Sequence, residues 1–178
     1  MARYVALLRG IGPSDPNMRN EKLRAVFESL GFHGVQTVLS SGNVLFETQR
    51  RAARAVEATI EKALQTQLGL TSTTILRSEI QLRRLVAEQP FKGMEHTPRS
   101  SLNVTFLRAK PRSGLRFPYR VEGKGYVVLG IYDRALCSVV DLTEARTPDL
   151  MRWLDKEFGQ EITTRTWKTV QRILKKWR

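Results

Sequence analysis

The chain has little of the chemistry that metal sites and covalent catalysts commonly use. Its 178 residues include one cysteine, Cys137, and two histidines, His33 and His96. A single cysteine excludes an internal disulfide and a thiolate cluster for zinc or iron-sulfur centres. Neither histidine has a partner at metal-ligand spacing, so we expect no metal and no cofactor. Cys137 lies in a valine-rich segment, where a small core residue is expected.

Long apolar runs are also missing. The segment YVALL at residues 4–8 is bounded by Arg3 and Arg9, and it is far too short for a signal-peptide core or a membrane span. We therefore expect a soluble, cytoplasmic protein with no membrane partner. With 41% apolar and 26% charged residues, the chain can still build a hydrophobic core.

Phosphate-binding loops of the usual kinds are absent. Gly10 and Gly12 begin a dinucleotide fingerprint, but Asp15 stands at its third glycine position, and no Gly-Lys-Ser/Thr sequence marks a P-loop. Aromatic residues amount to 8%. The expected strands at 3–9 and 44–47 hold only Tyr4 and Phe46, fewer than an RNA-recognition sheet uses.

Acidic residues are few beside the basic ones: 17 against 30, for a net charge of +13. Residues 101–178 hold 16 of these bases against 8 acids, and such clustering favours polyanions. The alternative is a highly soluble basic surface with no specific partner. We predict a binding module for an anionic partner, either nucleic acid or a phosphorylated ligand. The predicted polyanion-binding residues are Arg108, Lys110, Arg112, Arg116, Arg172, Lys175 and Lys176.

The first 78 residues have the pattern of six alternating elements. Apolar periodicity and turn residues predict a strand at 3–9, a helix from about 18 to 30, strands at 35–39 and 44–47 around an SSGN hairpin, a helix through 56–68 and a strand at 71–77. This β-α-β-β-α-β order is the ferredoxin-like order. It predicts an N-terminal ferredoxin-like subdomain over residues 1–78.

Residues 79–178 predict a closely packed C-terminal α+β subdomain. Ser78 and Gln81 form a capping box for a helix that stops before Pro90. The expected strands are 102–107, about 118–122, 125–132 and 136–141, and a helix begins at Thr147 with Pro148 and Asp149. Thr163 or Thr164 is expected to cap a last helix, whose apolar stripe runs from Trp167 to Trp177.

Four segments also resemble a known family. The opening YVALLRGI, the helix end LRAVFESLGF, the hairpin SGNVLF and the terminal TTRTWKTV are similar to those of the bacterial family called domain of unknown function 1697. The resemblance implies a small α+β protein of two ferredoxin-like (βαββαβ-type) halves packed together, with no established activity. Relatives typically carry a glycine-rich, lysine-containing loop after the Arg-Gly-Ile turn. Here the loop holds Pro13 and Pro16, which remove two backbone donors.

Two polar clusters are candidate ligand sites. In a ferredoxin-like sheet the loops 10–17 and 40–43 lie side by side, and helix N-terminal amides there suit an anion. The residues concerned are Arg9, Gly10, Gly12, Ser14, Ser41, Gly42 and Asn43. An enzyme acting at this edge on a small phosphorylated or carboxylated metabolite is the alternative function, and ordinary turn chemistry is the simpler interpretation.

The second cluster is predicted at the start of the last helix. It consists of Thr163, Thr164, Arg165 and Lys168, which could hold a phosphate or carboxylate with the free amides of the first turn. The simpler interpretation is that a threonine caps the helix while Trp167 packs in the core.

Overall fold

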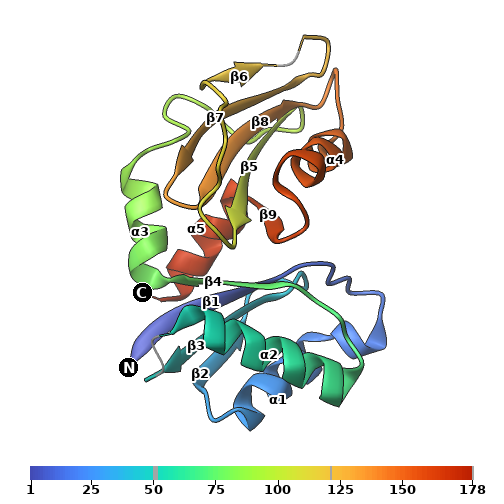
Figure 1. Cartoon of the computed structure of the whole chain (residues 1–178), viewed down its shortest axis with the longest axis vertical. Helices are drawn as coiled ribbons and strands as arrows, with labels where there is room; N and C mark the ends of the chain where they lie inside the picture. Colours follow the sequence, from blue (N-terminus) through green and yellow to red (C-terminus); the bar gives the residue numbers. More distant parts are fainter. Residues whose placement is uncertain (50–51, 121, 178) are drawn as a thin grey trace. The chain divides into compact units, whose positions relative to one another are not determined.

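The computed structural model describes residues 1–49, 52–120 and 122–177. It divides into two compact units: unit 1 comprises Met1–Leu82 and Arg172–Arg178, and unit 2 comprises Arg83–Gln171. The described residues form two antiparallel sheets and five α-helices (Figure 1), which is an α+β architecture. That residues 1–78 and 79–178 form closely packed subdomains stays a prediction.

Unit 1 is built on a four-stranded sheet. Its elements are β1 (Ala2–Leu8), a short 3-10 helix η1 (Pro16–Met18), α1 (Asn20–Ser29), β2 (His33–Thr37), β3 (Asn43–Thr48), α2 (Ala53–Leu68) and β4 (Thr74–Ser78). The strand order is β2-β3-β1-β4, and every neighbouring pair is antiparallel. Strand β3 therefore lies between β1 and β2. Because both are antiparallel to β3, their C-terminal ends lie at the same end of the sheet, which is the edge where the loops 10–17 and 40–43 were predicted to meet.

Helices α1 and α2 cover one face of this sheet (Figure 1). Phe27 of α1 and Ile60 of α2 are fully buried in a core that also contains Phe46 of β3. The ring of Phe46 lies 4.5 Å from that of Phe32 and 5.5 Å from that of Phe27, within the range of favourable aromatic pairs. The apolar faces predicted from helical spacing are thus the ones that fill this core.

Unit 2 contains a five-stranded sheet. Its elements are the end of α3 (Glu79–Ala87), β5 (Ser100–Leu107), β6 (Tyr119–Arg120), β7 (Tyr126–Tyr132), β8 (Ala135–Asp141), α4 (Thr147–Phe158), β9 (Ile162–Thr166) and the start of α5 (Trp167–Lys176). The order is β6-β7-β8-β5-β9. Val121, inside the predicted strand at about 118–122, lies outside the described residues.

The two sheets share a strand order but not a full set of helices. The series β7-β8-β5-β9 repeats the order of β2-β3-β1-β4. However, irregular chain at 108–118 connects β5 to β6, where a βαββαβ unit has its first helix. The α+β class is therefore shown, whereas two ferredoxin-like halves are not confirmed.

Helix α4 packs on the core of unit 2. Its buried residues Leu150 and Leu154 pack on the sheet, and the ring of Trp153 lies 5.3 Å from that of Tyr119. The helix begins at Thr147, as predicted, because the Asp149 carboxylate accepts a 2.9 Å hydrogen bond from the Arg146 amide. None of the helices in the described ranges is long and apolar enough to cross a bilayer.

The prediction for the last helix is wrong at its start. The segment ITTRT forms β9 and pairs with β5, with Thr163 opposite Phe106 and Thr164 opposite Thr105. Helix α5 begins only at Trp167, and Thr166 Oγ1 accepts the Thr169 amide at 3.3 Å. Isoleucine and threonine are β-branched and favour a strand, so the cap lies two or three residues later than the pattern suggested.

Candidate functional site

The loops 10–17 and 40–43 are in contact, as their place in the sheet predicts. The Leu8 amide donates to the Gly42 carbonyl at 2.9 Å. A Cβ at Gly42, where φ is +73°, would lie 2.8 Å from Ile11 Cγ1, closer than any normal contact. Only glycine fits at this crossing.

The polar side chains of this edge serve the hairpin itself. Asn43 is 1% exposed, and its amide donates to the Val38 carbonyl at 2.9 Å and to Ser41 Oγ at 3.0 Å. Asn20 Nδ2 donates to the Leu39 carbonyl at 3.1 Å. Asn43 and Ser41 therefore hold the turn together, which agrees with the simpler interpretation of this sequence.

Polar groups of the loop 10–17 also bond to other groups of the protein. The Gly12 amide lies 3.1 Å from Met18 Sδ, and the Asn17 amide donates to Asp15 Oδ1 at 2.8 Å. The Arg9 carbonyl accepts from Ser72 Oγ at 2.7 Å, while Ser14 is exposed. Asp15 caps the short helix η1, whereas α1 begins after Arg19 without a side-chain cap. A ligand role for Arg9, Gly10, Gly12, Ser14, Ser41, Gly42 and Asn43 stays a prediction.

The second predicted cluster does not form around a helix N-terminus. Arg165 Nη1 donates to Thr163 Oγ1 and to the Thr164 carbonyl, both at 2.8 Å, and burial of the guanidinium lowers the pKa of Arg165 to about 10. Thr164 Oγ1 lies 2.8 Å from Thr105 Oγ1. These three residues thus bond within and beside β9, and Lys168 stands apart from them in the first turn of α5.

Helix α5 presents a one-sided basic face. Lys168, Arg172, Lys175 and Lys176 are all exposed, and helical geometry places them within an arc of about 100°. Val170 and Ile173, on the opposite side, are fully buried. The helix WKTVQRILKK contains no acidic residue. We define these four residues as the α5 basic face.

The basic segment between β5 and β7 is less uniform than predicted. Arg108 is buried, and its Nη1 donates to Glu161 Oε1 at 2.8 Å, so the prediction that it offers a surface cation is wrong. Lys110, Arg112 and Arg116 are exposed on irregular chain. Lys110 and Arg112 share a hollow of about 240 Å³ with Glu157 and Glu161, whose carboxylates weaken its attraction for an anion.

Unit 2 also contains a groove that no sequence pattern marked. Its volume is about 850 Å³, and its lining includes the half-buried sheet residues Val127, Leu129 and Val139, the cations Arg99 and Arg120, and the acids Glu122, Asp141 and Glu144. Hydrogen bonds from the hydroxyl and amide of Thr143 lower the pKa of Asp141. The mixed charges of this lining do not select a polyanion. Its residues come from separate segments, so only the folded chain brings them together.

Trp167 lines a smaller, mostly apolar hollow. The hollow measures about 450 Å³ and is formed by Val86, Gln89, Phe91, Lys92 and Trp167. Trp167 is half-buried, with its ring 5.1 Å from that of Phe91, so it packs on a buried ring and keeps part of its surface accessible. Across the described ranges, no three His, Cys, Asp or Glu side chains gather as a metal site would need.

Comparisons with known proteins identify relatives but no activity. A family model described as "Protein of unknown function (DUF1697)" matches residues 1–120. The structure titled "conserved bacterial protein SP0830 from Streptococcus pneumoniae" is similar, with a TM-score of 0.70 and 20% sequence identity over 99% of this chain and 98% of that one. At this identity the likeness concerns the fold alone. A comparison with curated proteins found no match.

Proposed function

Because this chain belongs to the DUF1697 family of proteins of unknown function, we propose a function from its own surface: it binds nucleic acid through the phosphate backbone at the α5 basic face. The observation that carries this proposal is the exposure of four cations on one side of a helix whose other side is buried. The helix backbone fixes the spacing of these cations, so they can contact successive phosphates.

The spacing of the α5 basic face suits a row of phosphates. The eight-residue step from Lys168 to Lys176 spans about 12 Å along the helix axis. Phosphates of one duplex strand rise by about 3.4 Å each along the duplex axis and turn around that axis as they do so. A straight face of about 12 Å therefore reaches a few consecutive phosphates of one strand, which the four cations can contact.

The surrounding charge favours the same partner. The net charge of +13 steers polyanions towards the protein and raises the rate of association. Glu47 lines a hollow with Lys176, but its carboxylate is bonded to Arg3 at 3.2 Å. The charge of this acid is therefore offset by Arg3. Contacts to phosphates position a nucleic acid without reading its bases, so binding is expected to be weakly sequence-selective.

Salt dependence tests the proposal. Affinity for a fluorescent oligonucleotide of mixed sequence is measured by anisotropy in a series of salt concentrations beginning at low salt. The variant Lys168→Gln/Arg172→Gln/Lys175→Gln/Lys176→Gln should weaken binding and reduce the slope of log K against log salt by about three to four for a duplex.

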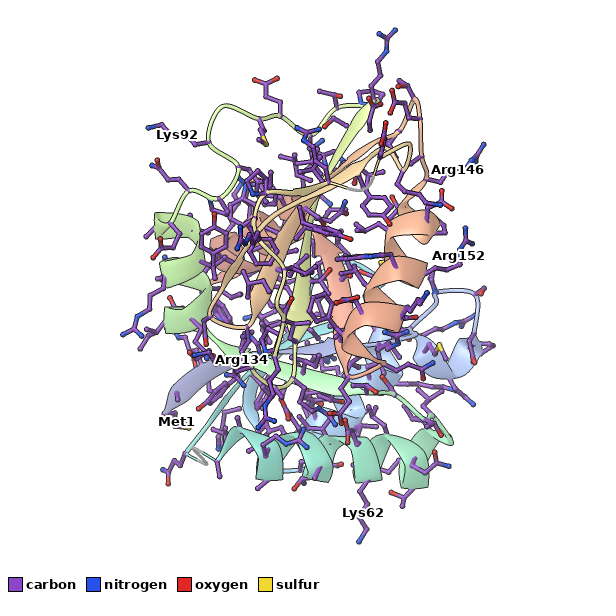
Figure 2. The ribbon with its side chains drawn as sticks, turned by 45° about the horizontal axis from the view of Figure 1, so that its top comes forward. Met1, Lys62, Lys92, Arg134, Arg146 and Arg152 are labelled. Atoms are coloured by element: carbon purple, nitrogen blue, oxygen red, sulfur yellow. The ribbon has the colours of Figure 1, made fainter. Side chains whose placement is uncertain are left out.

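The matched control removes the same charge elsewhere. Arg19, Arg24, Lys62 and Lys156 are exposed on the first, second and fourth helices or beside them, and Lys62 extends away from α2 (Figure 2). Replacing these four by Gln should leave most of the slope in place. Equal effects of the two quadruple variants would mean that only net charge matters, and undetectable binding by the wild type at low salt would exclude the function.

A further inference from the structure

We infer that the hollow beside Trp167 receives an unpaired nucleobase, so that the nucleic acid bound along α5 is single-stranded. This inference rests on the proposed function and names its substrate class more narrowly. Its basis is the half-buried aromatic ring of Trp167 at the start of the helix that carries the basic face.

The hollow has the lining that base stacking requires. Val86, Phe91 and Trp167 give it apolar walls, and its volume of about 450 Å³ lies within the range of about 300 to 1,000 Å³ typical of small-ligand sites. Phe91 is 6% exposed and supports the Trp167 ring from one side at 5.1 Å. The indole is therefore held in a fixed position while part of its surface remains open.

Two cations belong to the surroundings of this ring. Lys92, on the connector after α3, lines the hollow and extends away from the ribbon (Figure 2), and Lys168 follows Trp167 directly in α5. Burial, together with the nearby Lys168, lowers the pKa of His96, which keeps this imidazole uncharged at neutral pH. Two lysines beside an aromatic platform can hold the phosphates that flank a stacked base.

Stacking on Trp167 distinguishes single-stranded from double-stranded nucleic acid. In a duplex both faces of every internal base are occupied by its neighbours, whereas an unpaired base can place one face on an aromatic side chain. Aromatic residues combined with a basic track are the means by which proteins bind single strands without sequence preference. The apolar hollow adds nothing to phosphate binding, so it should affect single strands and leave duplexes nearly unchanged.

The first experiment compares a mixed-sequence single strand with the duplex of the same length. Trp167→Leu should weaken binding of the single strand by about 5- to 150-fold, with the salt slope unchanged because no charge is removed. Trp167→Phe should retain most of the affinity, and Trp177→Leu, directly after the last residue of α5, serves as the control for loss of an indole. An unchanged single-strand affinity, or an equal loss for the duplex, would overturn the inference.

A second measurement avoids dependence on the folding of Trp167→Leu. The variant Trp153→Phe/Trp177→Phe leaves Trp167 as the one remaining tryptophan of three. A bound single strand should quench its fluorescence, and a bound duplex should not. If the α5 basic face governs binding but quenching is absent, the stacking inference alone fails. If replacing the α5 basic face has no specific effect, the proposed function fails.

Discussion

The carboxylate of Glu57 accepts a 2.9 Å hydrogen bond from the backbone amide of Leu76. One helical turn later, Glu61 Oε1 accepts the Thr74 amide at 2.8 Å. Both amides belong to β4, which is an edge strand of the unit 1 sheet. Because unpaired amides on an edge strand invite pairing with another chain, α2 protects this edge with two side chains.

Removing these carboxylates should expose the edge. Glu57 is 3% exposed, so Glu57→Ala should lower the free energy of unfolding by about 1.5 to 3 kcal/mol, the usual contribution of a hydrogen bond to a charged group. Glu57→Ala/Glu61→Ala should also self-associate. Urea denaturation and light scattering measure the two effects. Glu28→Ala, which breaks only an exposed ion pair with Arg24, is the control. A Glu57→Ala/Glu61→Ala protein as stable and as monomeric as Glu28→Ala would contradict the protection of β4 by these two carboxylates.

Gly42 should tolerate no side chain. Gly42→Ala combines a left-handed backbone with contacts of 2.8 and 2.9 Å to Ile11. Gly10→Ala is the matched control, since φ is +75° there but nothing lies within 4 Å of the added Cβ. We expect Gly10→Ala to cost about 1 to 2 kcal/mol and Gly42→Ala about 1 to 3 kcal/mol more. Equal losses of stability for Gly42→Ala and Gly10→Ala, measured by thermal or urea unfolding, would show that the loop shifts to make room for the added Cβ.

Asn43 should behave as a structural residue. Asn43→Ala leaves the Val38 carbonyl without the 2.9 Å bond from Nδ2 and should destabilise the protein by about 1 to 3 kcal/mol. Asn17→Ala, which removes a 3.5 Å bond to the Leu68 carbonyl and a 2.8 Å bond from Lys22, both at exposed positions, should cost far less. Equilibrium unfolding of both variants measures the difference. A stable Asn43→Ala protein that had lost binding of a small anion would instead favour a ligand site at this edge.

Cys137 should be unreactive in the native state. The thiol is fully buried in β8, and burial raises its pKa to about 12. The thiolate is the reactive form, and a raised pKa keeps the thiol protonated until the pH approaches that value. Labelling by a thiol reagent should therefore stay slow from pH 7 to pH 9 and become complete in urea. Rapid labelling of the folded protein at pH 7 would show that this strand opens.

Local signals in the sequence were sufficient where a feature depends on neighbouring residues. The Ser78 and Gln81 capping box forms in both directions, at 2.9 and 3.2 Å. Gly69 ends α2 with a φ of +66°. These features follow from a few consecutive residues, so a single sequence contains all the information that determines them.

Features set by distant residues could not be predicted in the same way. Strand β9 forms because β5, which ends 55 residues before β9 begins, offers it an edge: Leu107 pairs with Ile162. The buried Arg108 bonds to Glu161, and the half-buried Trp167 packs on Phe91. No periodicity records such pairings, which explains why the basic face of the last helix was found in part while the hollow at its start was missed.

The segment that begins at Arg172 belongs to unit 1 although unit 2 precedes it in the chain. The Trp177 carbonyl accepts a 3.3 Å hydrogen bond from Arg3 of β1, so residues from both ends of the sequence complete one unit. Domains commonly fold in the order in which they are synthesised. Here the ribosome synthesises every residue of unit 2 before the last residues of unit 1. Unit 1 is therefore the first unit to be started and the last that can complete its fold.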